Sequence, residues 1–206
     1  MCRWIAYLED PINVGSVLYE PKNSIVRQSK ESHLGAEATN GDGFGVGWYI
    51  DGFEEPVRYR STQPAWNDEN LKEIARDLES RCFITHVRAG TSTPVQQTNC
   101  HPFRYGKWLF AHNGLISGWH KVRRELSFAV DPSLYSDIMG STDSEVMFHL
   151  ALTLGLEDDP IGAIERMVGM VEKECAKIGA DKGLQMTVCA TEGTKLYAAR
   201  YATQGV

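Results

Sequence analysis

The chain begins with the sequence MCRWIAYL (residues 1–8), in which a cysteine at position 2 directly precedes a run of β-forming residues. Removal of Met1 would make Cys2 the first residue, so that a thiol and a free α-amine would belong to the same residue. An α-amine has an unperturbed pKa of about 7.7–8.0 and can act as the base for its own thiol near neutral pH. A cysteine at this position could also be a core residue, because a free cysteine commonly behaves as a small buried hydrophobic side chain. The rest of the sequence must distinguish a nucleophile from a core thiol.

The composition predicts a single globular domain over residues 1–206. Apolar residues make up 42% of the chain and charged residues 23%, and no apolar run approaches the roughly 18 residues that a membrane span needs. The net charge is −6, and basic residues cluster only at 121–124, which argues against a nucleic-acid partner. We therefore expect a small-molecule substrate, with neither a membrane nor a nucleic acid as partner.

The five cysteines are odd in number and widely spaced, in a chain that begins without a secretory signal pattern. This argues against a disulfide framework and predicts a cytoplasmic protein. Cys82, Cys175 and Cys189 lie in apolar segments and are interpreted as core thiols. Only Cys2 and Cys100 are candidates for chemistry.

Short β-like runs recur from one end of the chain to the other, at 4–8, 46–50, 57–60, 82–87, 108–112, 184–190 and 195–201, with a hairpin turn predicted at 191–194. Helical spacing of apolar residues appears at 71–78, 119–126 and 161–178. The first of these helices would begin at Asn67 or Asp68, and the last would have Asp159 as N-cap and Gly179 at its end. The sequence TDSE (142–145) is a capping box before a further helix, in which Glu145 would reach back to the N-cap. Many strands with two late helices favour an α+β fold of two stacked antiparallel sheets with helices outside.

Three segments carry more polar residues and glycine than a purely structural role requires. The glycine-rich segment 40–48 is interpreted as a tight turn into a strand. Arg88 follows an apolar strand, where a guanidinium could bind a carboxylate or simply be a solvated or ion-paired strand end, and His86 before it is interpreted as a core residue. Asn113 and Gly114 also follow an apolar strand and offer two adjacent N–H donors, although Asn-Gly is equally a turn signal.

Asp143 adds an acidic group at the start of a predicted helix. Its carboxylate could complement the helix dipole, or it could bind an ammonium group of a ligand. The candidate groups together suit one kind of ligand, an amino acid whose carbonyl group is attacked. They comprise a thiol with an amine, two N–H donors, a cation and an anion.

Six short motifs in this order resemble class II glutamine amidotransferase domains, of the N-terminal nucleophile hydrolase superfamily and of the small stand-alone type. The motifs are MCR (1–3), DGFG (42–45), HVR (86–88), HPF (101–103), HNG (112–114) and TDSE (142–145). The resemblance implies an αββα sandwich of two antiparallel sheets between helical layers. It also implies an enzyme without cofactor or metal that cleaves a γ-glutamyl amide through a thioester on the N-terminal cysteine.

The same resemblance implies a role for each matching residue. Cys2 would be the nucleophile, and Asn113 and Gly114 would form the oxyanion hole. Arg88 would bind the α-carboxylate of the substrate, Asp143 would bind its α-ammonium group, and Thr91 would assist Arg88.

The sequence differs from the synthase-linked members of this family directly after the arginine. Those members usually carry an aromatic residue there, whereas this chain has Ala89 and Gly90. The small stand-alone members include γ-glutamyl amide hydrolases of ergothioneine biosynthesis and a glutathione-degrading subunit. The substrate could therefore be glutamine, with a partner synthase subunit as ammonia acceptor, or a larger γ-glutamyl compound. Stand-alone relatives generally continue past the point where this chain stops, so the C-terminal end could be incomplete.

Two other interpretations remain open from the sequence. A metal-binding or regulatory module could use Cys82, His86, Cys100, His101 and His112, although no Cys-x-x-Cys pair is present. A pseudoenzyme subunit would bind γ-glutamyl ligands without turning them over.

Overall fold

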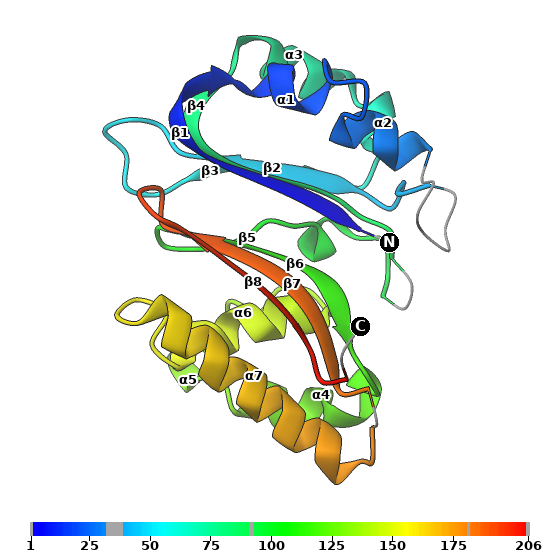
Figure 1. Ribbon diagram of the computed structural model, residues 1–206, viewed down its shortest axis with the longest axis vertical. Coiled ribbons are helices and arrows are strands. Elements are labelled where there is room, and N and C mark those ends of the chain that lie inside the picture. The colour runs from blue at the N-terminus through cyan, green and yellow to red at the C-terminus, as the bar shows by residue number, and fades with distance from the viewer. Residues whose placement is uncertain (1, 32–38, 91–92, 181, 205–206) are drawn as a thin grey trace. The chain divides into compact units, whose positions relative to one another are not determined.

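The computed structural model describes residues 2–31, 39–90, 93–180 and 182–204 of the chain (Figure 1). These residues form two antiparallel sheets with flanking helices, so the predicted α+β fold is confirmed. The chain divides into two compact units, which are described separately. The first unit comprises residues 1–111 and 189–196, and the second comprises residues 112–188 and 197–206.

The first sheet has the strand order β1-β4-β2-β3. Its strands are β1 (Arg3–Asn13), β2 (Phe44–Trp48), β3 (Val57–Ser61) and β4 (Glu79–Val87). Val87, the last residue of β4, pairs with Arg3 on one side and with Phe44 on the other. Because the pairing is antiparallel, β1 and β2 both begin where β4 ends. The residues just before β1, just before β2 and just after β4 are therefore brought together at one edge of this sheet.

Helices cover one face of the first sheet (Figure 1). They are α1 (Val14–Leu18), α2 (Ile25–Lys30), the 3-10 turn η1 (Ala65–Asn67) and α3 (Glu69–Asp77). Alternate strand residues such as Phe44 and Phe83 pack with Leu71 of α3 in one apolar core. Asp68 is the N-cap of α3 and accepts a hydrogen bond from the Leu71 amide at 2.8 Å, so one of the two predicted caps is correct. The short helices α1 and α2 are not predicted by the sequence pattern.

The opposite face of the first sheet has its own contacts within the first unit. Ile84 of β4 packs there with Leu109, Ala111 and Cys189. Gly45 lies in β2, and a Cβ atom at this residue would lie only 2.2 Å from the carbonyl oxygen of His101. Segment 40–48 is therefore a turn that leads into a strand, as interpreted from the sequence, with β2 beginning at Phe44. The glycine in this strand allows a neighbouring segment to approach it closely.

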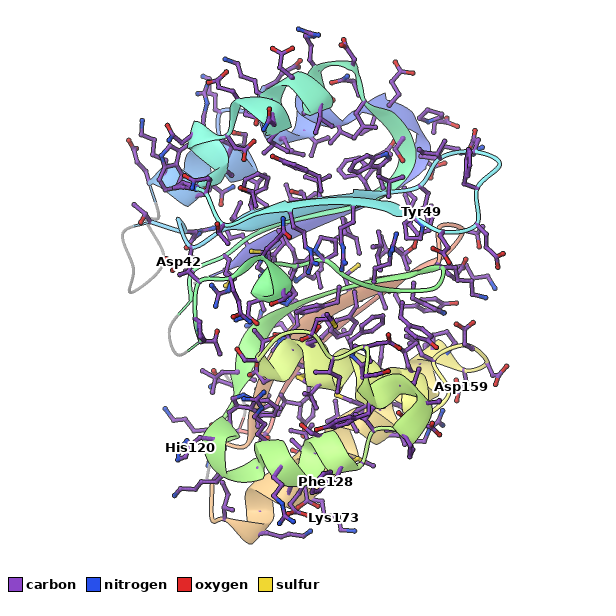
Figure 2. The ribbon with its side chains drawn as sticks, turned by 180° about the vertical axis from the view of Figure 1, so that it is seen from behind. Asp42, Tyr49, His120, Phe128, Asp159 and Lys173 are labelled. Carbon is purple, nitrogen blue, oxygen red and sulfur yellow. The ribbon has the colours of Figure 1, made fainter. Side chains whose placement is uncertain are left out.

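The second sheet has the strand order β5-β6-β7-β8. Its strands are β5 (Phe103–Tyr105), β6 (Trp108–Ile116), β7 (Leu184–Thr191) and β8 (Leu196–Ala202). The short strand β5 was not predicted; it pairs antiparallel with β6. The predicted hairpin turn joins β7 to β8, with Gly193 at a φ of +96°. Tyr49, labelled in Figure 2 just after β2, donates its hydroxyl hydrogen bond to the carbonyl oxygen of Lys107 at 2.7 Å or of Thr191 at 2.8 Å.

The second unit contains α4 (Trp119–Phe128), α5 (Pro132–Tyr135), α6 (Asp143–Thr153) and α7 (Pro160–Lys177). Helices α4, α6 and α7 contact one another, and residues 144–151 of α6 are buried. Helix α7 follows its predicted cap, because the Asp159 carboxylate accepts from the Gly162 amide at 3.0 Å, and it ends just before Gly179, whose φ is +65°. Over the described ranges, no helix combines the length and the apolar character that a membrane crossing requires.

Candidate active site

Cys2 lies directly before β1, beside the residues that follow β4. Its Sγ accepts a hydrogen bond from the Ala89 amide at 3.2 Å and lies 3.4 Å from the Ala89 carbonyl oxygen, to which the thiol can donate. Burial raises the pKa of the Cys2 thiol, whereas the Ala89 backbone and the positive charge of Arg88 act to lower that pKa. The thiolate is the nucleophilic form of cysteine. The first unit therefore places two groups that favour a thiolate next to Cys2.

Arg88 is buried, with 3% of its surface exposed. Its Nη1 donates to the carbonyl oxygen of Asp42 at 3.2 Å, and its Nη2 donates to the Oγ1 and the carbonyl oxygen of Thr93 at 2.6 and 3.2 Å. All three acceptors are neutral oxygens, and Arg88 forms no ion pair with any residue that the structure describes. The alternative of a solvated strand end is therefore wrong, and no described residue supports an ion-paired one. A buried guanidinium without a carboxylate partner suits an anionic ligand, because an uncompensated buried charge is costly.

Asp42 holds the segment after β4 in place. Figure 2 labels this residue, which lies shortly before β2. Its carboxylate accepts from the Gly90 amide at 2.8 Å, and its own amide donates to the Arg88 carbonyl oxygen at 3.1 Å. The Arg88 amide in turn donates to the Gly43 carbonyl oxygen at 2.8 Å. The DGFG motif therefore fixes the backbone on both sides of the arginine, a function that the sequence motif alone did not indicate.

Asn113 and Gly114 lie within β6, which continues to Ile116. The alternative of an Asn-Gly turn is therefore wrong. Gly114 has a φ of +149°, and a Cβ atom at this position would lie 1.9 Å from the carbonyl oxygen of Gln185 in β7. Only glycine fits here, because any side chain would collide with the neighbouring strand.

Asp143 is the first residue of α6, and both of its carboxylate oxygens accept backbone hydrogen bonds. Oδ1 accepts from the Ser144 amide at 2.8 Å, and Oδ2 accepts from the Ile116 amide at 2.9 Å. The carboxylate is therefore held between the start of the helix and the end of β6, within the second unit. This position also complements the positive end of the helix dipole.

The first half of the capping box, the cap by Thr142, is confirmed. Thr142 Oγ1 accepts from the Glu145 amide at 3.2 Å, as an N-cap should. The Glu145 carboxylate accepts from the amides of Met139 and Gly140, at 3.1 and 2.6 Å. Glu145 thus ties down the loop that leads into the helix.

His112 connects the strand of the HNG motif to the helix of the TDSE motif. Its Nδ1 lies 2.8 Å from the Ser144 Oγ, which in turn lies 3.3 Å from Asp143 Oδ1. Burial lowers the pKa of His112, while the Asp143 carboxylate and the Gln185 backbone act in the opposite direction. Residue type suggested His112 only as a metal ligand and did not reveal its contact with Ser144, because this contact joins residues that are far apart in the sequence.

The predicted site residues that the structure describes thus fall into two groups, one in each compact unit. Cys2 and Arg88 lie in the first unit, whereas Asn113, Gly114 and Asp143 lie in the second. Thr91 lies outside the described residues; among the residues that the structure describes, Thr93 contacts Arg88.

The alternative of a metal-binding module finds no support. Within the described part of the chain, no group of three or more His, Cys, Asp and Glu side chains is arranged to hold a metal ion. The buried His86 instead stacks on His101, with 4.1 Å between ring centroids, and Cys82 Sγ lies 3.4 Å from Thr191 Oγ1. Cys82, Cys175 and Cys189 are buried free thiols, in agreement with their interpretation as core residues.

The chain belongs to the class II glutamine amidotransferase family, because the model of that family matches residues 26–203. Among curated proteins, it is similar to the probable glutamine amidotransferase DUG3 of Saccharomyces cerevisiae, with 38% identity over 74% of this chain and 45% of that protein. It is also similar to the γ-glutamyl-hercynylcysteine sulfoxide hydrolase of Mycolicibacterium smegmatis, with 29% identity over 96% of this chain and 78% of that protein. The chain thus spans less than half of the yeast relative.

Solved structures agree with this family. A glutamine aminotransferase class-II domain protein from Silicibacter pomeroyi has a TM-score of 0.79 and 33% identity, and the match covers 100% of this chain and 79% of that one. The glutamine phosphoribosylpyrophosphate amidotransferase of B. subtilis has a TM-score of 0.62 and 14% identity, over 97% of this chain and 37% of that one. At this low identity, the second likeness shows the fold alone.

Proposed function

We propose that the protein is an amidohydrolase that cleaves γ-glutamyl amides with Cys2 as the nucleophile. The observation that carries this proposal is the buried guanidinium of Arg88, whose acceptors among the described residues are all neutral and which lies close to the Cys2 thiol in the first unit. A cation of this kind is suited to the α-carboxylate of an amino acid, and a thiol nearby is suited to attack its side-chain amide. Membership of the class II glutamine amidotransferase family supports the same assignment.

The proposed reaction begins after Met1 has been removed. The freed α-amine of Cys2 accepts the thiol proton, and the thiolate attacks the γ-carbonyl carbon of the substrate. Asn113 and Gly114 donate hydrogen bonds to the resulting oxyanion, and Arg88 and Asp143 bind the α-carboxylate and the α-ammonium group. Collapse of the tetrahedral intermediate breaks the C–N bond and releases ammonia or an amine, which takes up the proton. Water then hydrolyses the γ-glutamyl thioester to glutamate and regenerates the thiol.

The names of the relatives support two substrate candidates. One relative is named a probable glutamine amidotransferase, which supports glutamine, with a partner chain as the acceptor of ammonia. Another is named a hydrolase of γ-glutamyl-hercynylcysteine sulfoxide, which supports a γ-glutamyl compound with a larger leaving group. The two candidates share the glutamyl half and differ only in the leaving group.

A product assay tests the proposal. Protein that is confirmed by intact mass to begin at Cys2 is incubated with glutamine, glutathione and other γ-glutamyl amides, and the release of glutamate, ammonia and amine is measured. We expect glutamate from at least one of these compounds and about 10⁴-fold less turnover, or none, for Cys2→Ala.

A second measurement identifies the nucleophile directly. A glutamine-like diazo-ketone should add a single label to the wild-type protein, at Cys2. Unchanged labelling of Cys2→Ala would refute the role of this residue. Binding of γ-glutamyl ligands without any glutamate release would instead support a pseudoenzyme.

A further inference from the structure

We propose that Thr93 is a positioning residue that orients the Arg88 guanidinium for the substrate α-carboxylate. The inference rests on the proposed function and deepens it, because it names the residue that sets the specificity for a free α-carboxylate. Thr93 itself is not expected to touch the reacting atoms.

The hydrogen bonds of Arg88 carry the argument. A guanidinium has five N–H donors. Nη2 makes two contacts with Thr93, at 2.6 Å to Oγ1 and 3.2 Å to the carbonyl oxygen, and Nη1 makes one with the Asp42 carbonyl oxygen. The contact with the hydroxyl is the shortest of the three. The Nε–H and one Nη1–H have no acceptor among the described residues and are left for a ligand.

The chemistry of the acceptors explains why a threonine suits this position. A carboxylate beside Arg88 would orient the guanidinium equally well, but it would also neutralise the charge and compete with an anionic substrate. A hydroxyl and two carbonyl oxygens fix the group and leave its full charge available. Because Arg88 is buried, this charge is poorly screened by water and attracts an anion strongly.

Gly90 provides an independent observation of the same arrangement. The Arg88 side chain folds back over this glycine, so that a Cβ atom at Gly90 would lie 2.8 Å from Nη2 and 2.9 Å from Cζ. The guanidinium is therefore enclosed by Thr93 on one side and by the backbone of Gly90 on another. An alanine at position 90 would displace the guanidinium without removing any hydrogen-bonding group.

The experiment compares two substrates across a set of variants. One substrate is a γ-glutamyl anilide, and the other is the same anilide without its α-carboxylate. For Thr93→Val we expect kcat/KM to fall about tenfold for the first substrate and less than twofold for the second, because only the first uses Arg88. Thr93→Ser should restore most of the loss. Where turnover of the truncated anilide is too slow to measure, its competitive inhibition constant takes the place of kcat/KM.

Two further variants keep the inference open to refutation. In Gly90→Ala the added methyl group should displace the guanidinium, so kcat/KM should again fall only for the substrate with the α-carboxylate. This variant takes the place of Thr93→Val if the Thr93→Val protein does not fold. Thr98→Val, a matched change in the following turn, should affect neither substrate. Equal losses on both substrates, or no loss, for Thr93→Val and Gly90→Ala would overturn the role of Thr93. If Arg88→Ala also fails to distinguish the two substrates, the proposed carboxylate site itself is wrong; if it does distinguish them, only the positioning role fails.

Discussion

Arg88 and Asp143, which would bind the two charged ends of the substrate, are held in opposite ways. Arg88 is buried, donates hydrogen bonds to three neutral oxygens and forms no ion pair among the described residues. Asp143 is half-buried, and its charge is partly balanced by two backbone N–H groups and the start of α6. The charge of Arg88 is not balanced by a described residue, whereas the charge of Asp143 stabilises the local fold. This difference predicts that a substitution at Arg88 mainly lowers activity, and that a substitution at Asp143 has the larger effect on stability.

The largest effect is expected at Arg88. The change Arg88→Met keeps much of the apolar side-chain volume and removes the charge, so kcat/KM for a γ-glutamyl amide should fall roughly 100- to 1,000-fold. The free energy of unfolding should change by no more than about 1 kcal/mol, because the lost hydrogen bonds are offset by the removal of a buried charge. Steady-state kinetics and urea titration measure the two quantities. A large loss of stability would contradict the contrast with Asp143.

A smaller effect on activity, with a larger one on stability, is expected at Asp143. In Asp143→Asn, one of the two backbone donors at Ser144 and Ile116 would face an NH₂ group in place of an oxygen. We expect a loss of about 1–2 kcal/mol in unfolding free energy and a roughly 10- to 100-fold lower kcat/KM. An anilide that lacks the α-amine should show little of the kinetic loss. If that truncated substrate is affected just as strongly, Asp143 does not bind the ammonium group.

The smallest effect concerns pH and belongs to the region of Asp143, where the titratable side chain of His112 lies. Burial lowers the pKa of His112 and of His149 below their ordinary value near 6.5. The unfolded chain therefore binds more protons, and stability is lost as the pH falls below about 6.5 and through the lowered native values. Each histidine contributes a slope of up to about 1.4 kcal/mol per pH unit.

Urea midpoints between pH 7.5 and 5 test this dependence. His149→Gln should flatten the slope, whereas His120→Gln, at an exposed position labelled in Figure 2, should leave it unchanged. Equal slopes for the wild-type protein and His149→Gln would show that this buried histidine does not drive the acid sensitivity.

The two regions also differ in how much of their structure the sequence could predict. The start of the helix at Asp143 was predictable, because Thr142 caps it through a contact three residues apart. The surroundings of Arg88 were not, because Asp42 lies 46 residues away and reaches the arginine only through the pairing of β2 with β4. The contact of Thr93 with Arg88 likewise left no pattern in the sequence.

Local patterns in the sequence were sufficient for the α+β class, most strands and the caps at Asp68, Thr142 and Asp159, and the order of six motifs indicated the family. These features depend on residues within a few positions of one another, so their physical causes are visible in the linear chain. Only the folded chain shows that Arg88 is buried with no counter-ion in the part of the chain that the structure describes, that the Asn-Gly pair continues a strand, and that β7 excludes a side chain at Gly114. Such features arise from strand register and from packing between distant segments. The same local pattern is compatible with many strand pairings, and only the burial of side chains across the complete sheet determines which pairing forms.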